Sequence, residues 1–153
     1  MILRTLRNKE KEAVLEFLET RFGIEKSVFS GMEFLDNGKG RVFILGKTAA
    51  GFAVKEKIAC ISLPFVRLEG KIKPTSVMIQ SFGKHVKKNV LTLGKQEAKE
   101  FTEGFDLTIK NHGCSDGYVI LRYKDYSLGC GLLKGNNLKN MLPKAKRMPV
   151  EFL

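Results

Sequence analysis

The most reactive side chains in the sequence are three cysteines and two histidines. Cys60, Cys114 and Cys130 are an odd number without a C-x-x-C spacing, so the sequence predicts neither a metal site nor a disulfide framework. Reduced, mostly structural thiols in a cytoplasmic protein are the simpler interpretation. We expect Cys114 to be exposed in a polar loop and Cys130, between two glycines, to be buried.

Catalysis would require a nucleophile, a base and an orienting partner in one place. One polar loop holds His112, Cys114 and Asp116, and His112 could pair with Asp116 across it. A loop histidine is nevertheless more often a surface residue or a phosphate contact than a general base. We therefore predict no catalytic residue.

Glycine-rich segments offer no phosphate-binding loop. The segments 39–41 and 46–47 lack the strand–loop–helix order that the G-x-x-x-x-G-K motif needs. Gly38 and Gly40 are better explained as turn glycines of a hairpin. The sequence predicts no bound cofactor.

The clearest binding signal is positive charge. Lysine and arginine total 27 against 16 acidic residues, a net charge of +11, and no acidic residue lies between Asp125 and Glu151. This charge points to nucleic acid or another polyanion. The alternatives are solubility and protection of a strand edge. Two clusters stand out: Lys84, His85, Lys87 and Lys88, and further along Lys139, Lys144, Lys146 and Arg147.

The first 70 residues predict an α/β unit. Asn8 is expected to cap a helix that runs to Arg21 and stops at Gly23. Its apolar stripe would be Ala13, Val14, Phe17 and Leu18. Segments 31–35 and 41–45 flank a glycine-containing turn and predict a hairpin. Further strands are expected within residues 57–68, and no apolar run approaches the roughly 20 residues that span a bilayer.

The second half predicts a small β-rich unit that opens with a helix. Thr75 or Ser76 would cap this helix, which ends near Phe82. Gly129 and Gly131 lie inside a predicted strand, where glycine usually marks a bulge or a close approach. The other predicted elements are strands at 89–93, 106–110, 118–121 and 127–133, a helix at 95–103, and a final strand at 148–153 that closes a barrel.

Several separated motifs of the second half resemble a PUA-type RNA-binding domain, in the variant fused to Sun-family RNA cytosine-5 methyltransferases. The segments 128–131, 138–140 and 142–144 look like its last strands. Segments 73–75 and 79–84 resemble its opening strand and first helix. The first half resembles, more weakly, the pre-PUA domain of small two-domain ribosome-biogenesis factors.

This resemblance implies an α+β protein in which residues 1–70 form a pre-PUA-like α/β domain, packed on a PUA-like mixed β-barrel of residues 71–153. It implies binding to structured rRNA or tRNA, with both basic clusters on one surface because the loop after the first helix adjoins the final strand in PUA domains. Gly83 would permit a close backbone approach. Tyr123 and Tyr126 are candidates for stacking on a base, although we expect one ring in the core and the other on the surface.

The resemblance also raises methyltransferase activity, which the sequence argues against. The related catalytic domains use a Pro-Cys or Thr-Cys dipeptide, whereas Ala59, Gly113 and Gly129 precede the cysteines here. We therefore expect a non-catalytic protein without S-adenosylmethionine, working with RNA and with a methyltransferase or pre-ribosomal proteins. The main alternative is a protein-binding subunit of a separately encoded RNA cytosine-5 methyltransferase. A more remote one is a small RNA-modifying enzyme that uses Cys114 and His112.

Overall fold

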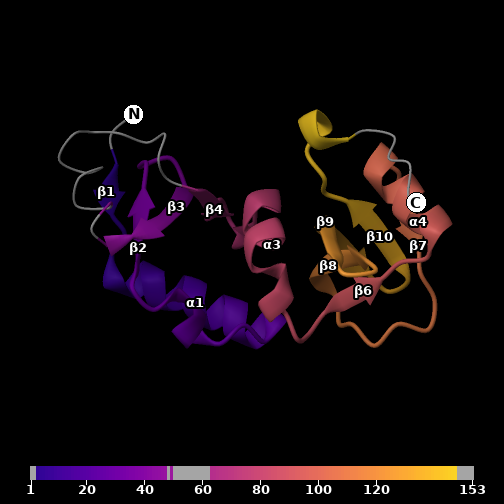
Figure 1. Cartoon of the computed structure of the whole chain (residues 1–153), viewed down its shortest axis with the longest axis horizontal. Coiled ribbons are helices and arrows are strands. Elements are labelled where there is room, and N and C mark those ends of the chain that lie inside the picture. The colour runs from indigo at the N-terminus through magenta and orange to yellow at the C-terminus, as the bar shows by residue number, and fades with distance from the viewer. Residues whose placement is uncertain (1–2, 48, 50–62, 148–153) are drawn as a thin grey trace. The chain divides into compact units, whose positions relative to one another are not determined.

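The structure is a computed structural model that describes residues 3–47, 49 and 63–147. It is an α+β protein, as predicted, and its contacts divide it into two compact units, Met1–Met78 and Ile79–Leu153. Each unit is built on a five-stranded sheet (Figure 1). Residues 50–62, which include Cys60 and part of the strands predicted at 57–68, and the predicted strand at 148–153 lie outside the described residues. In the part described, no helix is both long and apolar enough to cross a bilayer.

The sheet of the first unit is antiparallel, in the order β1-β2-β3-β4-β5. The hairpin predicted from the turn glycines is confirmed as β2 and β3. Lys73–Pro74, which the resemblance placed at the opening of the second half, pairs with β4 in this first sheet. The elements are β1 (Arg4–Thr5), α1 (Asn8–Phe22), η1 (Lys26–Phe29), β2 (Met32–Asp36), β3 (Arg41–Gly46), β4 (Leu63–Arg67) and β5 (Lys73–Pro74).

The helix α1 differs from its prediction at one end and in its buried face. Arg7, not Asn8, is the N-cap residue, and its side chain makes no capping bond. Gly23 ends the helix as predicted, with φ of 66°. The buried residues are Val14, Leu15, Leu18 and Phe22, whereas Ala13 is exposed and Phe17 half-buried. The apolar stripe is therefore rotated relative to the predicted one.

Three phenylalanines fill the core of the first unit. The rings of Phe29 and Phe65 meet edge to face with centroids 5.2 Å apart, and Phe34 lies 5.3 Å from Phe65. All three side chains are buried. Such aromatic pairs contribute about 0.5–1.5 kcal/mol beyond the area that they bury, so η1, β2 and β4 are held to one another.

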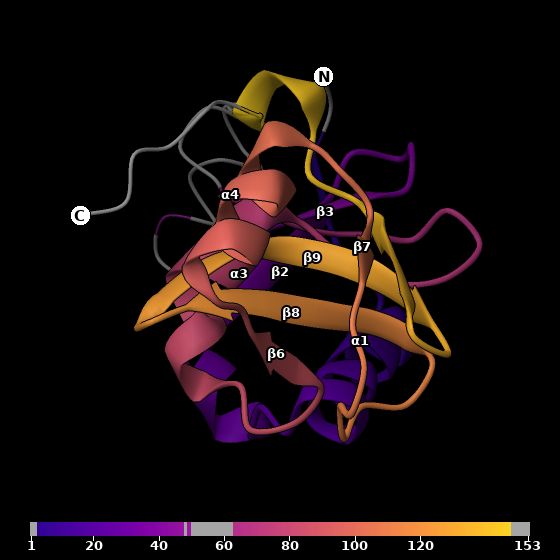
Figure 2. The same ribbon diagram turned by 90° about the vertical axis from the view of Figure 1, so that its right-hand side faces the viewer.

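The second unit is a curled mixed sheet in the order β6-β8-β9-β10-β7, with α4 across its concave face (Figure 2). β6 runs parallel to β8, and the other pairs are antiparallel. The helix at 95–103 is confirmed, and Ala98 and Phe101 are buried as expected. The elements from the unit boundary onward are α3 (Ser76–Phe82), η2 (Gly83–His85), β6 (Val90–Thr92), α4 (Lys95–Glu103), β7 (Leu107–Thr108), β8 (Gly117–Tyr123), β9 (Tyr126–Lys134), β10 (Asn137–Asn140) and η3 (Lys144–Lys146).

The two glycines of β9 mark a bulge and a close approach, as glycine inside a strand was predicted to do. The register shifts between Leu121 and Arg122 of β8, which leaves Leu128 as the extra residue of a bulge beside Gly129. A Cβ on Gly131 would lie 2.5 Å from Cδ1 of Leu138 and 3.1 Å from the carbonyl oxygen of Lys139. Glycine at this position thus lets β10 approach closely enough for Leu138 to be buried.

Asn140 connects β10 to the end of α4. Its Nδ2 donates to the carbonyl oxygens of Phe101 at 2.7 Å and Phe105 at 3.0 Å, and its Oδ1 accepts the N–H of Leu142 at 2.9 Å. Its own backbone N–H donates to Asp106 Oδ1 at 2.8 Å. The side chain is buried, so these bonds satisfy groups that water reaches poorly.

We expect Gly131→Ala to destabilise the protein by about 1–3 kcal/mol, because the added methyl group overpacks the contact with Leu138. Chemical denaturation would measure this free energy of unfolding. Gly113→Ala is the matched control, since a Cβ there meets nothing within 4 Å. Equal stability of the two variants would contradict the close approach of β10.

Asn140→Ala should cost roughly 2–4 kcal/mol of unfolding free energy. It leaves the Phe105 carbonyl and the Leu142 N–H without this partner, and it removes one of the two donors to the Phe101 carbonyl, the other being the Gly104 N–H at 3.0 Å. Asn140→Asp should also destabilise, because a carboxylate cannot donate to the carbonyls of Phe101 and Phe105. The control is Asn137→Ala in the exposed part of the same strand. An Asn140→Ala variant as stable as the Asn137→Ala variant would show that this network does not hold the unit together.

Candidate nucleic-acid interface

The first predicted basic cluster follows α3. Lys84, Lys87 and Lys88 are exposed, and His85 is half-buried. The preceding residue, Gly83, is buried and held by Arg122, whose Nη2 donates to the Gly83 carbonyl at 2.8 Å. A Cβ on Gly83 would lie 2.1 Å from Ser127 Oγ. The neighbour of Gly83 is thus the Ser127 side chain of strand β9, and the close backbone approach predicted at Gly83 stays a prediction.

The second cluster lies at the end of β10 and in η3. Lys139, Lys144 and Lys146 are exposed. Arg147 is half-buried and differs from them, because its Nε donates to the Leu142 carbonyl at 3.0 Å and its side chain lies against Gly104. A Cβ on Gly104 would come within 2.6 Å of Arg147 Cδ. Arg147 thus has a structural role, while the three lysines are directed to solvent.

The structure does not bring the two clusters together. In both views η3 (yellow) lies at the top of the second unit, beside the end of α4, whereas the connection from α3 to β6 runs along the bottom (Figures 1 and 2). The expectation of a shared surface relied on the final strand, which lies outside the described residues. Within the described part, each cluster is a separate basic surface.

The two tyrosines beside the β8–β9 turn differ in burial, as expected. Tyr123 is 8% exposed and belongs to the core, while Tyr126 is 69% exposed. The ammonium group of Lys124 lies 5.4 Å from the centroid of the Tyr123 ring. Tyr126 alone of the two presents a ring on which a base could stack.

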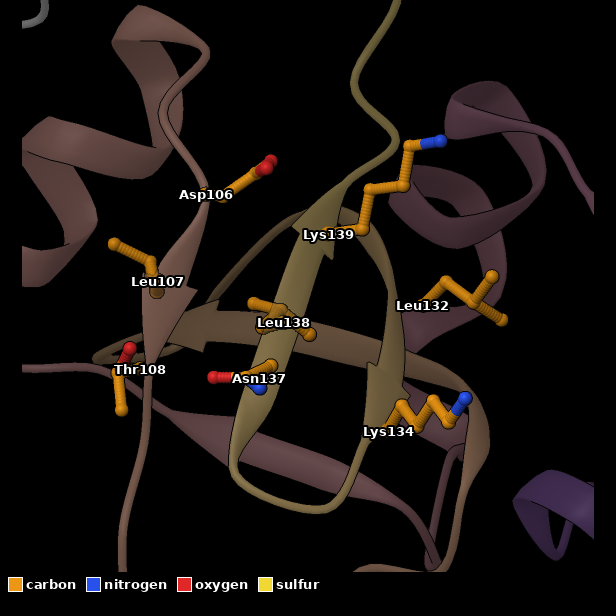
Figure 3. A pocket seen from close by; sticks show the side chains of 8 residues that line it. All are labelled: Asp106, Leu107, Thr108, Leu132, Lys134, Asn137, Leu138 and Lys139. Atoms are coloured by element: carbon orange, nitrogen blue, oxygen red, sulfur yellow. The ribbon is translucent and has the colours of Figure 1, made fainter.

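A groove of about 440 Å³ crosses the outer face of β7, β9 and β10 (Figure 3). Lys134 and Lys139 stand on one side of it, and Asp106 on the other, where its Oδ1 is engaged by the Asn140 N–H. Leu132 adds an apolar patch beside the lysines. Tyr118 pairs with Leu132 across the strands, and burial, with a smaller effect of Cys130, raises the pKa of its phenol above the ordinary 10.0. Tyr118 therefore stays a neutral group near the groove.

Two exposed residues of the second unit were not singled out from the sequence. Lys134 ends β9 and faces outward, a placement that the alternation of that strand could have indicated. Phe105 is 60% exposed and directly follows Gly104. Gly104 ends α4 with φ of 100°, so Phe105 does not continue the buried face of Phe101. An exposed aromatic ring thus stands where the chain passes Arg147.

The candidate catalytic residues have structural contacts instead. His112 Nε2 donates to the Gly135 carbonyl at 2.7 Å, its Nδ1 accepts the N–H of Cys114 at 3.3 Å, and Asp116 Oδ1 accepts the N–H of Gly135 at 2.9 Å. Both side chains therefore hold the β9–β10 turn. His112 and Asp116, which were considered as a possible pair, each bond to the backbone of Gly135.

The cysteines follow the prediction in one case and depart from it in the other. Cys130 is buried as expected. Cys114 is half-buried, not exposed, because it packs against the core and its thiol lies 3.7 Å from the Val90 carbonyl. Among the described residues, no three His, Cys, Asp or Glu side chains form a group that could hold a metal ion.

Comparisons with known proteins agree with this architecture. Residues 88–148 match the methyltransferase RsmF PUA domain family, and residues 4–57 match a family of unknown function (DUF7122). A curated relative, the ribosomal RNA small subunit methyltransferase F of Psychromonas ingrahamii, is 27% identical over 154 residues, which cover 93% of this chain. The chain spans only 30% of the length of that relative.

Two solved structures share the fold over 95% of this chain. A conserved PUA domain protein from Thermoplasma acidophilum matches with a TM-score of 0.61 and 13% identity over 97% of its own chain. A PUA domain protein from Aeropyrum pernix K1 matches with a TM-score of 0.58 and 15% identity over 89% of its chain. Residues 88–148 therefore form a PUA-like domain of the type fused to Sun-family RNA methyltransferases.

Proposed function

We propose that this protein binds structured rRNA or tRNA without catalysing a reaction, in ribosome biogenesis or RNA modification. The observation that carries the proposal is that the segment matching the PUA domain of a methyltransferase also holds the exposed lysines of β9, β10 and η3. The relative from Psychromonas ingrahamii is an enzyme of ribosomal RNA by its name, which supports RNA as the ligand.

The lysines would bind the phosphate backbone. Lys134 and Lys139 flank the groove, and Lys144 and Lys146 extend the positive surface from the end of β10. Lysine neutralises phosphates and releases their counterions, which positions a nucleic acid without reading its sequence. The cluster Lys84, His85, Lys87 and Lys88 would provide a separate contact to the same RNA.

Phe105 would supply the stacking surface for an unpaired base. An aromatic face accepts any base, and stacking contributes about 1–3 kcal/mol per base in proteins that bind single-stranded segments. Its 60% exposure and its position next to Gly104, beside Arg147, favour this role over a core role. Tyr126 would serve a second unpaired base at the far turn.

Two structural observations support a binding role over the alternatives. The polar atoms of His112 are engaged by backbone groups, and Cys114 is half-buried, so neither is poised to attack a substrate. If the first unit docked on a separate methyltransferase, we would expect exposed Phe or Met side chains on it. Leu63 is the one exposed large hydrophobic residue in the described part of that unit.

Replacing two lysines of η3 tests the phosphate contacts. We expect Lys144→Ala/Lys146→Ala to lower the log–log salt slope of tRNA binding by roughly 1.4–1.8, at 0.7–0.9 per phosphate, and to weaken binding about tenfold near 0.15 M salt. Thermal stability should not change, because both side chains are exposed. The control, Lys95→Ala/Lys110→Ala, removes equal charge elsewhere on the unit. Unchanged affinity of the η3 variant would move the site away from this surface.

Replacing Phe105 tests stacking. Phe105→Ala should cost about 1–3 kcal/mol in binding to RNA with unpaired bases and leave the salt slope unaltered, because stacking releases no counterions. Phe105→Trp should preserve binding. The two variants and the wild type would be compared by fluorescence anisotropy of labelled RNA. A change in the salt slope, or equal binding by Phe105→Ala and wild type, would contradict the role in stacking.

A further inference from the structure

Three cations lie directly opposite one another on neighbouring strands of the first unit. Arg41, the first residue of β3, pairs with Arg67, the last residue of β4, and Arg67 pairs with Lys73, the first residue of β5. Residues directly opposite in antiparallel strands share a face of the sheet. Arg41 and Arg67 are exposed and Lys73 is half-buried. We name Arg41, Arg67 and Lys73 the cation row.

A row of this kind costs stability in the free protein. Like charges directly opposite each other on adjacent strands are destabilising, whereas opposite charges there would be favourable. Strand pairing in the folded sheet brings these residues together, so each repels its neighbour wherever the fold is formed. An ordinary solubilising surface would have both signs interspersed.

The acidic residues at this end of the sheet do not neutralise the row. Asp36 binds Arg4, with its Oδ2 2.7 Å from Arg4 Nε. Glu69, two residues after Arg67, lies against Gly40, where a Cβ would come within 3.1 Å of Glu69 Cγ. In the part of the chain that the structure describes, no ion pair involves Arg41, Arg67 or Lys73.

The neighbouring loops add charge of the same sign. The turn that precedes Arg41 carries Lys39, and the connection from β4 to β5 carries Lys71; both lysines are exposed. The N–H of Leu68 donates to the Gly40 carbonyl at 2.8 Å, so these two loops meet. The row therefore lies beside further lysines at one end of the sheet, where β3 and β4 run next to each other (Figure 1).

The dimensions suit a phosphate backbone. Neighbouring strands lie about 4.8 Å apart, so three cations on adjacent strands extend over roughly 10 Å. Double-stranded DNA carries one negative charge per about 1.7 Å of helix axis, so a stretch of roughly 10 Å of a duplex presents several phosphates to such a row. Two of the three cations are arginines, whose planar guanidinium binds phosphate through paired hydrogen bonds.

We propose that the cation row is a second phosphate-binding site for RNA, on the first unit and separate from the lysines of the PUA-like domain. This inference rests on the proposed RNA binding and extends it to the unit whose role the comparisons leave open. RNA phosphates would relieve the repulsion within the row, so binding and folding of this sheet end would favour each other.

The test compares Arg41→Gln/Arg67→Gln with Arg7→Gln/Lys9→Gln, which removes the same charge at the start of α1. The probe is bulk tRNA, titrated at several salt concentrations, with poly-glutamate as a competing polyanion of another class. We expect the row variant to lose about 1.4–1.8 units of log–log salt slope and to bind roughly tenfold more weakly near 0.15 M salt. The control variant should lose little of either.

A second measurement uses the proteins without RNA. At low salt, Arg41→Gln/Arg67→Gln should raise the melting temperature above that of wild type, because it removes the repulsion. The stability control is Lys47→Gln, at an exposed residue that follows β3 and is not in the row, and it should not raise the melting temperature. A row variant that melts at or below the wild-type temperature would remove the reason for assigning a ligand to the row. The proposal would also be overturned if the row variant kept the salt slope of the wild-type protein. It would be overturned as well if the wild-type protein bound poly-glutamate but not tRNA.

The outcomes separate this inference from the proposed function. If wild type binds tRNA and Lys144→Ala/Lys146→Ala weakens it while the row variant does not, only the cation row is refuted. If wild type does not bind tRNA at all, both proposals fail. Weakening by both double variants, with additive losses of salt slope, would support two phosphate-binding sites in one chain.

Discussion

The buried carboxamide of Asn140 is the interaction on which the arrangement of the second unit depends. One planar group donates to two carbonyls at the end of α4 and accepts the N–H of Leu142, so it fixes helix, strand and the segment leading to η3 together. Only an amide combines two donors with an acceptor in this geometry. The backbone of Phe105 and that of Leu142 are both bonded to this side chain, so the segment that leads to the η3 lysines is anchored to the end of α4.

Local signals predicted much of the fold. The β2–β3 hairpin, α4 and the close approach at Gly131 all depend on turn glycines, helix caps or residue size. A short stretch of sequence is enough to identify each of these signals. The prediction of the buried face of α1 was wrong because helical spacing allows two overlapping apolar stripes. One contains Ala13 and Phe17, and the other, which is the one buried, contains Leu15 and Phe22. β10 was expected only from the resemblance, which placed segment 138–140 among the last strands. The residue pattern alone did not predict it, because Lys139 and Asn140 look like a polar tail until the register with β9 is known.

The candidate site was less predictable, because charge identifies cations but not what each one contacts. The sequence grouped Arg147 with the lysines, yet its guanidinium is tied to the Leu142 carbonyl and lies over Gly104. Phe105 follows Phe101 at helical spacing and was hidden by that pattern, since the left-handed turn at Gly104 changes its direction. Arg41 is distant in sequence from Arg67 and Lys73, and only strand pairing reveals that the three residues are neighbours.

The strand order of the second unit constrains how it assembles. β6 and β7 follow each other along the chain, separated by α4, but they form opposite edges of the sheet (Figure 2). β8, β9 and β10 form a continuous meander of local contacts, which close with little loss of chain entropy. During synthesis β6 leaves the ribosome before its partner β8 exists, so it has to wait unpaired. The meander is therefore the part of the sheet that local contacts alone can form, whereas both edge strands require contacts between residues that are distant in the sequence.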